Sequence, residues 1–130
     1  MINQANPYKR YQQTRVETAG PLQLVIMLYD GAIRFVHQAQ QAILDKKPML
    51  ANEYLQRAQD IVNELMITLN PEAGEIAANL RSLYEFMIYR LVQANLRKDP
   101  EMLEDVAGLL STLRSAWAEL QIPAKEAVGK

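Results

Sequence analysis

The chain has 130 residues, with 14 Lys and Arg against 15 Asp and Glu, one His and no Cys. A formal net charge of −1 provides no field that would gather nucleic acid or an anionic membrane, and the lack of Cys excludes disulfides, zinc–thiolate sites and thiol catalysis. The longest strictly apolar run, residues 24–29, is far shorter than the ~20 residues of a membrane-spanning helix, and residues 1–15 lack the apolar middle of a secretory signal. We therefore expect a cytoplasmic, single-domain protein without membrane insertion or a nucleic-acid partner.

Residues 1–18 form a segment of their own, with few aliphatic side chains, a proline after Asn6 and two tyrosines, Tyr8 and Tyr11. This composition predicts a mobile segment that is extended or partly helical. Each tyrosine nevertheless offers a large apolar ring with a polar tip. We expect these rings to lie in a groove of the following domain and to leave it when a partner arrives.

Five prolines divide the rest of the chain at intervals of about 25 residues: Pro21, Pro48, Pro71, Pro100 and Pro123. Proline is well tolerated in the first turn of a helix, because its missing N–H would have no partner there. The first four prolines therefore predict helix starts, the clearest being the one capped by Asp99, and Pro123 predicts the end of the last helix. We expect the folded domain at residues 19–121 and a frayed tail at residues 122–130.

Between the prolines, apolar residues recur every three or four positions, which is the period of an amphipathic helix. No segment alternates between apolar and polar residues with the period of a strand. Four helices with short connections must run antiparallel, so the sequence predicts an all-α fold, an antiparallel four-helix bundle. We assign four large residues to its core: Leu28, Leu80, Leu113 and Trp117.

The segments 22–36 and 76–92 are apolar over more of their surface than one helix contact needs. Two explanations remain open: each helix packs between two neighbours, or part of the apolar area binds a helix or peptide of a partner. In the second case the partner-binding residues are those that the core stripes do not need: Tyr8, Tyr11, Ile26, Tyr29, Ile33, Tyr84, Ile88 and Tyr89. Gly31 indicates a close helix crossing, because glycine costs about 1 kcal/mol relative to alanine within a helix, and Asp30 indicates a polar break in the groove wall.

Patterns for catalysis or metal binding are missing from the sequence. His37 is the only histidine, and Arg34 stands where the Glu-x-x-His motif of di-iron bundles needs glutamate. A histidine phosphotransfer domain is an alternative, although residues 38–41, Gln-Ala-Gln-Gln, lack the lysine and glycine typical of that class. Without the lysine, a phosphohistidine loses its main charge partner. We expect no enzyme activity, no metal and no cofactor.

Residues 6–35, NPYKRYQQTRVETAGPLQLVIMLYDGAIRF, closely resemble the start of the FliS family of flagellar secretion chaperones. Later stretches, RAQDIVNEL, GEIAANLRSLYEFMIYRLVQANLRKDPEMLEDV and LLSTLRSAW, resemble the same family in order. The resemblance implies a helical bundle without enzyme activity or cofactor that binds the disordered C-terminal segment of flagellin, one to one, in the cytoplasm. Such a chaperone prevents premature polymerisation and delivers flagellin to a component of the flagellar type III export gate.

With flagellin as the client, residues 1–17 become a removable cover for one apolar groove. Deleting them is expected to leave intact or raise the affinity for a flagellin C-terminal peptide, measured by titration. A strong fall in affinity would make the segment a direct client contact. A bundle with exposed grooves can also form a homodimer when no client is present. The remaining alternative, a generic protein-interaction bundle unrelated to flagella, predicts no flagellin binding.

Overall fold

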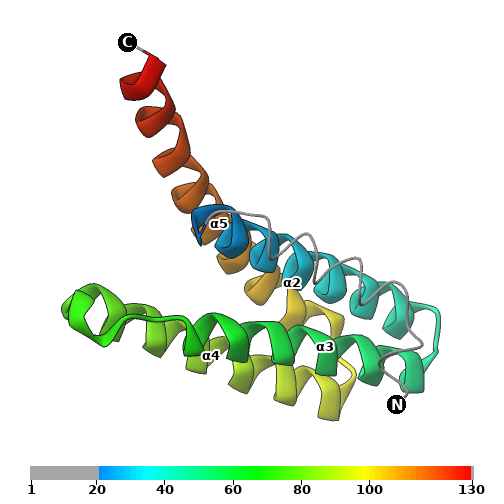
Figure 1. The fold of residues 1–130 in the computed structure, drawn as a ribbon. Helices are drawn as coiled ribbons and strands as arrows, with labels where there is room; N and C mark the ends of the chain where they lie inside the picture. Colours follow the sequence, from blue (N-terminus) through cyan, green and yellow to red (C-terminus); the bar gives the residue numbers. More distant parts are fainter. Residues whose placement is uncertain (1–20, 130) are drawn as a thin grey trace, which may run out of the picture.

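The computed structural model describes the backbone of residues 21–129 and the side chains of residues 21–120. This part of the chain forms four α-helices and one short 3₁₀ turn, without a strand (Figure 1). The elements are α2 (Pro21–Leu44), α3 (Pro48–Ile67), η2 (Pro71–Ala73), α4 (Glu75–Arg97) and α5 (Pro100–Gly129). The prediction of an all-α fold is confirmed. The segment predicted at residues 1–18, with Tyr8 and Tyr11, lies outside the described residues.

The four helices pack in a ring around one core. α2 contacts α3 and α5, and α4 contacts the same two helices. The connections are a few residues long, so successive helices run in opposite directions (Figure 1). This is the predicted antiparallel four-helix bundle. Because α2 and α4 each have two neighbours, packing explains much of their wide apolar surface.

Three of the four predicted helix starts are confirmed. The Asp99 carboxylate accepts a hydrogen bond of 2.9 Å from the backbone N–H of Glu101, which satisfies one free donor in the first turn of α5. Proline is the first residue of three helices, at Pro21, Pro48 and Pro100. At this position the missing N–H of proline costs no intrahelical bond.

The third predicted start is wrong by four residues. Pro71 begins η2, where the Asn70 side chain accepts a hydrogen bond of 3.0 Å from the Glu72 N–H. Gly74 then adopts φ 70°, a left-handed value that a residue without Cβ reaches at little cost. The helix α4 begins only at Glu75, after this change of direction.

The predicted end of the last helix at Pro123 is also wrong, since α5 continues to Gly129. A proline inside a helix removes one backbone hydrogen bond and bends or breaks many helices. Here residues of high helix propensity follow the proline, including Ala124, Glu126 and Ala127. Their propensity favours helical backbone across the proline. The fraying of residues 122–130 stays a prediction.

The core changes character along the bundle. At the end formed by the α2–α3 and α4–α5 connections, small buried side chains stand beside large ones such as Leu55 and Leu103, and the small ones are Ala39, Ala42, Ala51, Ala94 and Ala107. At the opposite end, Tyr29 and Tyr84 are fully buried and Trp117 packs against the core. The distance between packed helices follows the size of the side chains between them. The helices therefore converge at the alanine end and separate toward the aromatic end (Figure 1).

Gly31 lies at a close crossing of α2 and α3, as its position within a helix predicted. A Cβ atom built on Gly31 would lie 3.1 Å from Cδ1 of Ile61, closer than an ordinary van der Waals contact. The missing side chain allows the two helices to approach each other, which compensates for the low helix propensity of glycine.

Candidate partner-binding site

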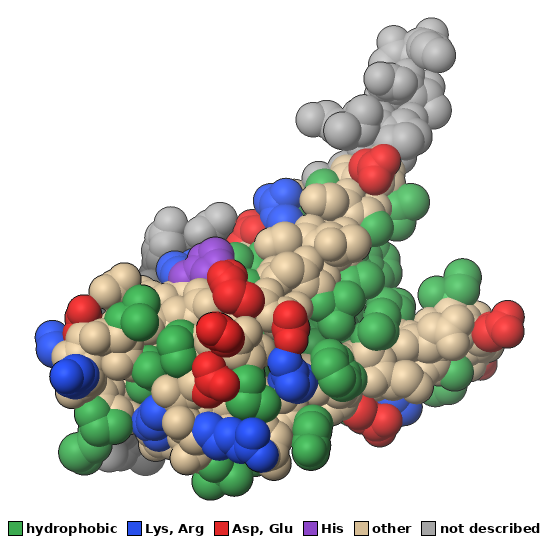
Figure 2. All heavy atoms as spheres, turned by 180° about the vertical axis from the view of Figure 1, so that it is seen from behind, with side chains coloured by type: hydrophobic (Ala, Val, Ile, Leu, Met, Phe, Trp, Pro, Cys, Tyr) green, Lys and Arg blue, Asp and Glu red, His purple; other side chains and the backbone are tan. Residues whose placement is uncertain are grey.

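The aromatic end of the bundle is open on one side. α5 leaves the bundle there, and its last turns stand away from the neighbouring ends of α3 and α4 (Figure 1). Hydrophobic side chains gather on the concave surface between α5 and those helix ends (Figure 2). We call this surface the notch. From the apolar stripes of α4 and α5 we infer that five side chains form it: Ile76, Leu80, Leu113, Trp117 and Leu120.

The α4 wall of the notch continues the core stripe of that helix. Leu91 and Met87 are fully buried, Leu80 is half-buried and Ile76 is 68% exposed. Successive members of this set are four or seven positions apart, so they share one face of α4. Exposure rises toward the start of α4 because α5 diverges from it in that direction.

The α5 wall is built in the same way. Leu110 is fully buried, Leu113 and Trp117 are half-buried, and Leu120 is 56% exposed. These residues are three or four positions apart and lie on one face of α5. Two core stripes thus leave the bundle and face each other across the notch. Contact between an apolar concave surface of this kind and the apolar face of an amphipathic helix is more favourable in free energy than contact with water.

A hydrogen-bonded aromatic cluster joins three helices at the base of the notch. The hydroxyls of Tyr29 on α2 and Tyr84 on α4 are 2.5 Å apart and share a hydrogen bond. Trp117 on α5 donates its indole N–H to the Tyr29 hydroxyl at 3.2 Å. The two tyrosine rings have centroids 6.5 Å apart. Because their polar atoms are paired, these aromatic side chains can be buried without the cost of an unsatisfied donor or acceptor.

Burial raises the pKa of both buried tyrosines. Desolvation is the largest cause in each, and for Tyr29 the hydrogen bonds with Tyr84 and Trp117 partly oppose it. Burial of a phenol disfavours the charged phenolate, so the folded state holds both protons at a pH where an unfolded chain would release them.

Alkaline pH is therefore expected to destabilise the bundle. The unfolded tyrosines release their protons near pH 10 while the folded ones keep them, so the free energy of unfolding is fully maintained below about pH 10 and falls by about 1.4 kcal/mol per pH unit for each group above it. Urea unfolding at a series of pH values from 8 to 11 measures this slope. Tyr84→Phe should reduce the slope, and Tyr89→Phe, at a side chain that is 60% exposed, is the matched control. An equal slope in Tyr84→Phe and wild type would contradict the assignment.

An ion pair connects α2 and α5 beside the aromatic cluster. Arg114 donates from Nε to Oδ1 of Asp30 at 2.6 Å and from Nη2 to Oδ2 at 3.3 Å. The side chains are 39% and 48% exposed, respectively. Asp30 interrupts the apolar surface of α2, as the sequence predicted, and its carboxylate binds the neighbouring helix.

Three of the predicted partner-binding residues are core residues. Ile26 is 4% exposed, and Tyr29 and Tyr84 are at most 1% exposed, so none offers a free surface to a partner. The sequence prediction allowed one apolar stripe per helix for the core and assigned these three residues to a partner. In the structure α2 and α4 each pack against two helices, so a second stripe of each helix is also buried. Ile33 and Ile88 are half-buried and pack against the core. Tyr8 and Tyr11 lie outside the residues that the structure describes.

Tyr89 is the predicted site residue with a free surface. It is 60% exposed and belongs to an apolar stripe on the outer face of α4 that points away from the core. The stripe consists of Phe86, Tyr89, Val92 and Leu96, with exposed fractions between 37% and 75%. It forms a second exposed apolar surface, separate from the notch stripe on the same helix.

The sequence assigned three notch residues to the core, and it placed the other two on the apolar stripes of their helices without identifying them as partner contacts. All four residues predicted to be core are half-buried and pack against the core on one side: Leu28, Leu80, Leu113 and Trp117. The other side of each side chain is partly exposed to solvent. Ile76 and Leu120 were missed as partner contacts. Their spacing from the core stripes was a usable signal, but the divergence of α4 and α5 that exposes them is not encoded in the spacing.

His37 lies on the exposed surface of α2, in a shallow depression at the alanine end. The depression is lined by His37, Gln40, Gln41, Leu44, Pro100, Glu101 and Glu104. Its two carboxylates would repel a phosphoryl group on the imidazole, and none of the described residues in its lining is a cation that could stabilise one. This environment disfavours the phosphotransfer alternative.

Within residues 21–129, no cluster of three or more histidine, aspartate or glutamate side chains is arranged to hold a metal ion. Over the same range, none of the helices combines the length and hydropathy needed to cross a membrane.

Comparison with known proteins places these features in one family. Residues 4–125 match the family model described as flagellar protein FliS. The flagellar secretion chaperone FliS of Bacillus subtilis is 43% identical over 114 residues, which cover 88% of this chain and 85% of the relative. The protein of the same name from Salmonella typhimurium is 41% identical over 122 residues, covering 89% and 90%. The one from Vibrio cholerae is 36% identical over 115 residues, covering 87% and 85%.

Proposed function

This chain belongs to the FliS family of flagellar secretion chaperones, and we propose that it binds the disordered C-terminal segment of flagellin in the cytoplasm. Binding covers the apolar faces that flagellin uses in the filament and so prevents premature polymerisation. The complex, with one client per chaperone, then delivers flagellin to a component of the type III export gate. The chaperone needs no cofactor and has no enzyme activity in this proposal.

The observation that carries the proposal is the pair of core stripes that leave the bundle in the notch. An amphipathic helix laid between α4 and α5 would replace the helix contact that the bundle lacks there. Burial of Ile76 and Leu120, which are 68% and 56% exposed, would contribute about 1 to 2 kcal/mol for each side chain. The half-buried residues Leu80, Leu113 and Trp117 add to this contact.

The outer stripe of α4, Phe86, Tyr89, Val92 and Leu96, is a second contact in this proposal. A disordered segment can follow both surfaces, because it folds as it binds and wraps a large area. The ordering of the client opposes binding and limits the affinity, so an extensive complex can still be released at the export gate.

Calorimetry with a peptide of the C-terminal ~50 residues of a cognate flagellin tests the proposal. We expect saturable one-to-one binding, a negative heat-capacity change from apolar burial, and a gain of helix in the circular dichroism of the mixture. The chain contains a single Trp, and Trp117 lies in the notch, so its fluorescence emission should change on binding. Absence of heat, of added helix and of a fluorescence change would exclude flagellin as the client and leave a generic interaction bundle.

A further inference from the structure

The polar contacts of α5 with α4 end earlier along the helix than those with α2. In its first half α5 is bonded to both neighbours: Gln40 of α2 donates to the Pro100 carbonyl at 3.1 Å, and Arg90 of α4 forms an ion pair with Asp105. At the centre of the helix Arg114 pairs with Asp30 of α2, and three residues later Trp117 donates to Tyr29 of α2. Among the described side chains, no hydrogen bond or ion pair links α4 to α5 beyond Asp105.

The loss of polar contacts with α4 coincides with the opening of the notch. Where α5 is bonded to both neighbours the helices enclose the core, and where it is bonded to α2 alone its apolar stripe separates from that of α4. The two notch walls attract each other, because contact between them would remove apolar side chains such as Ile76 and Leu120 from water. The contacts of α5 with α2 oppose this approach of α5 to α4.

We propose that the Asp30–Arg114 ion pair and the Trp117–Tyr29 hydrogen bond are a latch that holds α5 against α2 and keeps the empty notch open. Asp30 and Arg114 are positioning residues in this proposal, since they act through α5 and not by contact with the client. The two contacts are three positions apart on α5 and bind residues that are adjacent on α2, so together they fix both the position and the rotation of α5. The functional part of the proposal rests on the proposed client binding.

An open notch has a defined benefit for binding. A site that is already in its bound shape spares the client the free energy of separating two apolar walls. If the latch is broken, α5 is expected to approach α4, and the client must then compete with this internal contact. The affinity falls although none of the client's own contacts has been removed.

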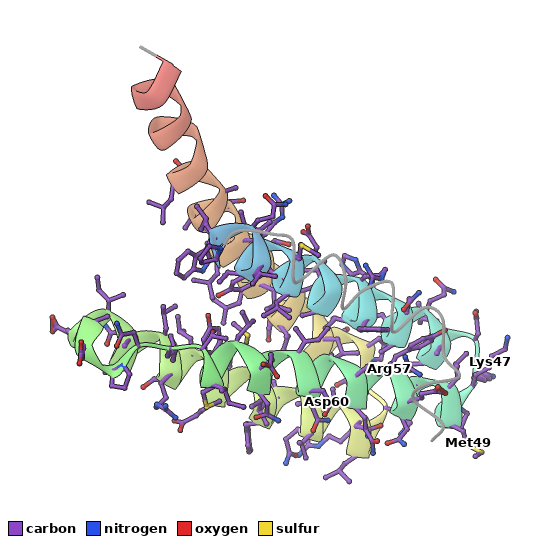
Figure 3. All side chains as sticks on the ribbon, in the orientation of Figure 1. Lys47, Met49, Arg57 and Asp60 are labelled. Carbon is purple, nitrogen blue, oxygen red and sulfur yellow. The ribbon has the colours of Figure 1, made fainter. Side chains whose placement is uncertain are left out.

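The distance between the two walls can be measured directly, because the chain contains no Cys. Asn79→Cys on α4 and Glu119→Cys on α5 replace exposed residues and provide two positions for spin labels. Pulsed electron resonance should give one narrow distance distribution in the otherwise wild-type chain. Asp30→Asn and Arg114→Gln should each give a shorter, broader distribution. Glu53→Gln, which breaks the exposed ion pair with Arg57 within α3, is the matched control and should leave the distribution unchanged. Arg57 lies on α3 (Figure 3).

The affinity for the flagellin peptide is measured on the same variants without labels. We expect Asp30→Asn and Arg114→Gln each to weaken binding by about fivefold, in the range of a partly exposed bidentate pair. The double variant should be no weaker than either single one, because both remove one interaction. The charge-swapped pair Asp30→Arg with Arg114→Asp should recover part of the affinity. Trp117→Phe, which keeps a ring but removes the indole donor, should shorten the distance further in the Arg114→Gln background.

Two outcomes would overturn the latch. Unchanged distance distributions in both ion-pair variants would show that other contacts hold α5 in place. Shorter distances with unchanged peptide affinity would show that the opening of the notch does not position the client. If the wild-type chain binds no flagellin peptide at all, the proposed function fails, and the distance distributions still decide whether the ion pair keeps the notch open.

Discussion

Replacing Ile76 and Leu120 together by aspartate is expected to weaken flagellin binding at least about 100-fold while the bundle stays folded. Both side chains are more than half exposed in the free protein, so the new carboxylates remain in water until a client arrives. In the complex, two apolar contacts are lost and two charges must be desolvated without partners. A loss of about 1.4 kcal/mol at each position already accounts for two orders of magnitude.

The matched control is a second pair of exposed hydrophobic residues at the opposite end of the bundle. Leu44 is 64% exposed at the end of α2, and Met49 is 86% exposed at the start of α3. Met49 lies at the alanine end, far from the notch (Figure 3). Leu44→Asp with Met49→Asp introduces the same charges and should leave the Kd unchanged in calorimetry. Equal losses of affinity in the two double variants would assign the effect to net charge and would contradict the notch as the binding surface.

Tyr84→Ala is expected to produce the largest loss of stability among single substitutions at the aromatic end. The ring is fully buried among three helices, and its removal leaves a cavity and breaks the hydrogen bond to Tyr29. Large-to-small changes of this kind cost about 3 to 5 kcal/mol, which corresponds to a fall in Tm of about 10 °C or more for a domain of this size. Urea and thermal unfolding followed by circular dichroism measure the change.

Tyr84→Phe separates the ring from its hydroxyl. It keeps the packing and removes one hydrogen bond, so we expect a cost of about 1 kcal/mol. Peptide affinity should remain close to the wild-type value in Tyr84→Phe, because the Tyr84 hydroxyl is buried and bonds with the Tyr29 hydroxyl, so it is not available to the client. If Tyr84→Phe weakens binding strongly and leaves stability intact, Tyr84 is a partner contact after all, as its position in the sequence first suggested.

The helical fold was predictable because its signals are local. The proline at the start of α5 and the Asp99 cap fix a boundary through contacts within three residues. Apolar residues at a spacing of three and four define an inner face without knowledge of the neighbour. Gly31 was interpretable for the same reason, since its cost within a helix demands a close contact nearby.

The site was less predictable, because it depends on how the helices diverge. Tyr29 and Tyr84 were expected at a surface, but both are buried in the core, where a hydrogen bond between residues 55 positions apart satisfies their hydroxyls. Ile76 has the same spacing as buried residues of α4 and is nevertheless 68% exposed. Its exposure depends on where α5 diverges from α4, and in the latch proposal long-range contacts such as Asp30–Arg114 set that divergence. The spacing of apolar residues within one helix carries no information on contacts between distant helices.

The taper of the core from alanine to aromatic side chains has a mechanical consequence. When two helices touch at one end and separate at the other, a small change of distance at the touching end alters the angle between them. Added volume at that end, for example at Ala39 or Ala94, is expected to tilt whole helices, because close-packed interiors cannot absorb extra atoms locally. The width of the notch is therefore expected to depend also on small residues at the far end of the molecule, in addition to the contacts between α2 and α5. A substitution there would change the notch without altering a residue that lines it.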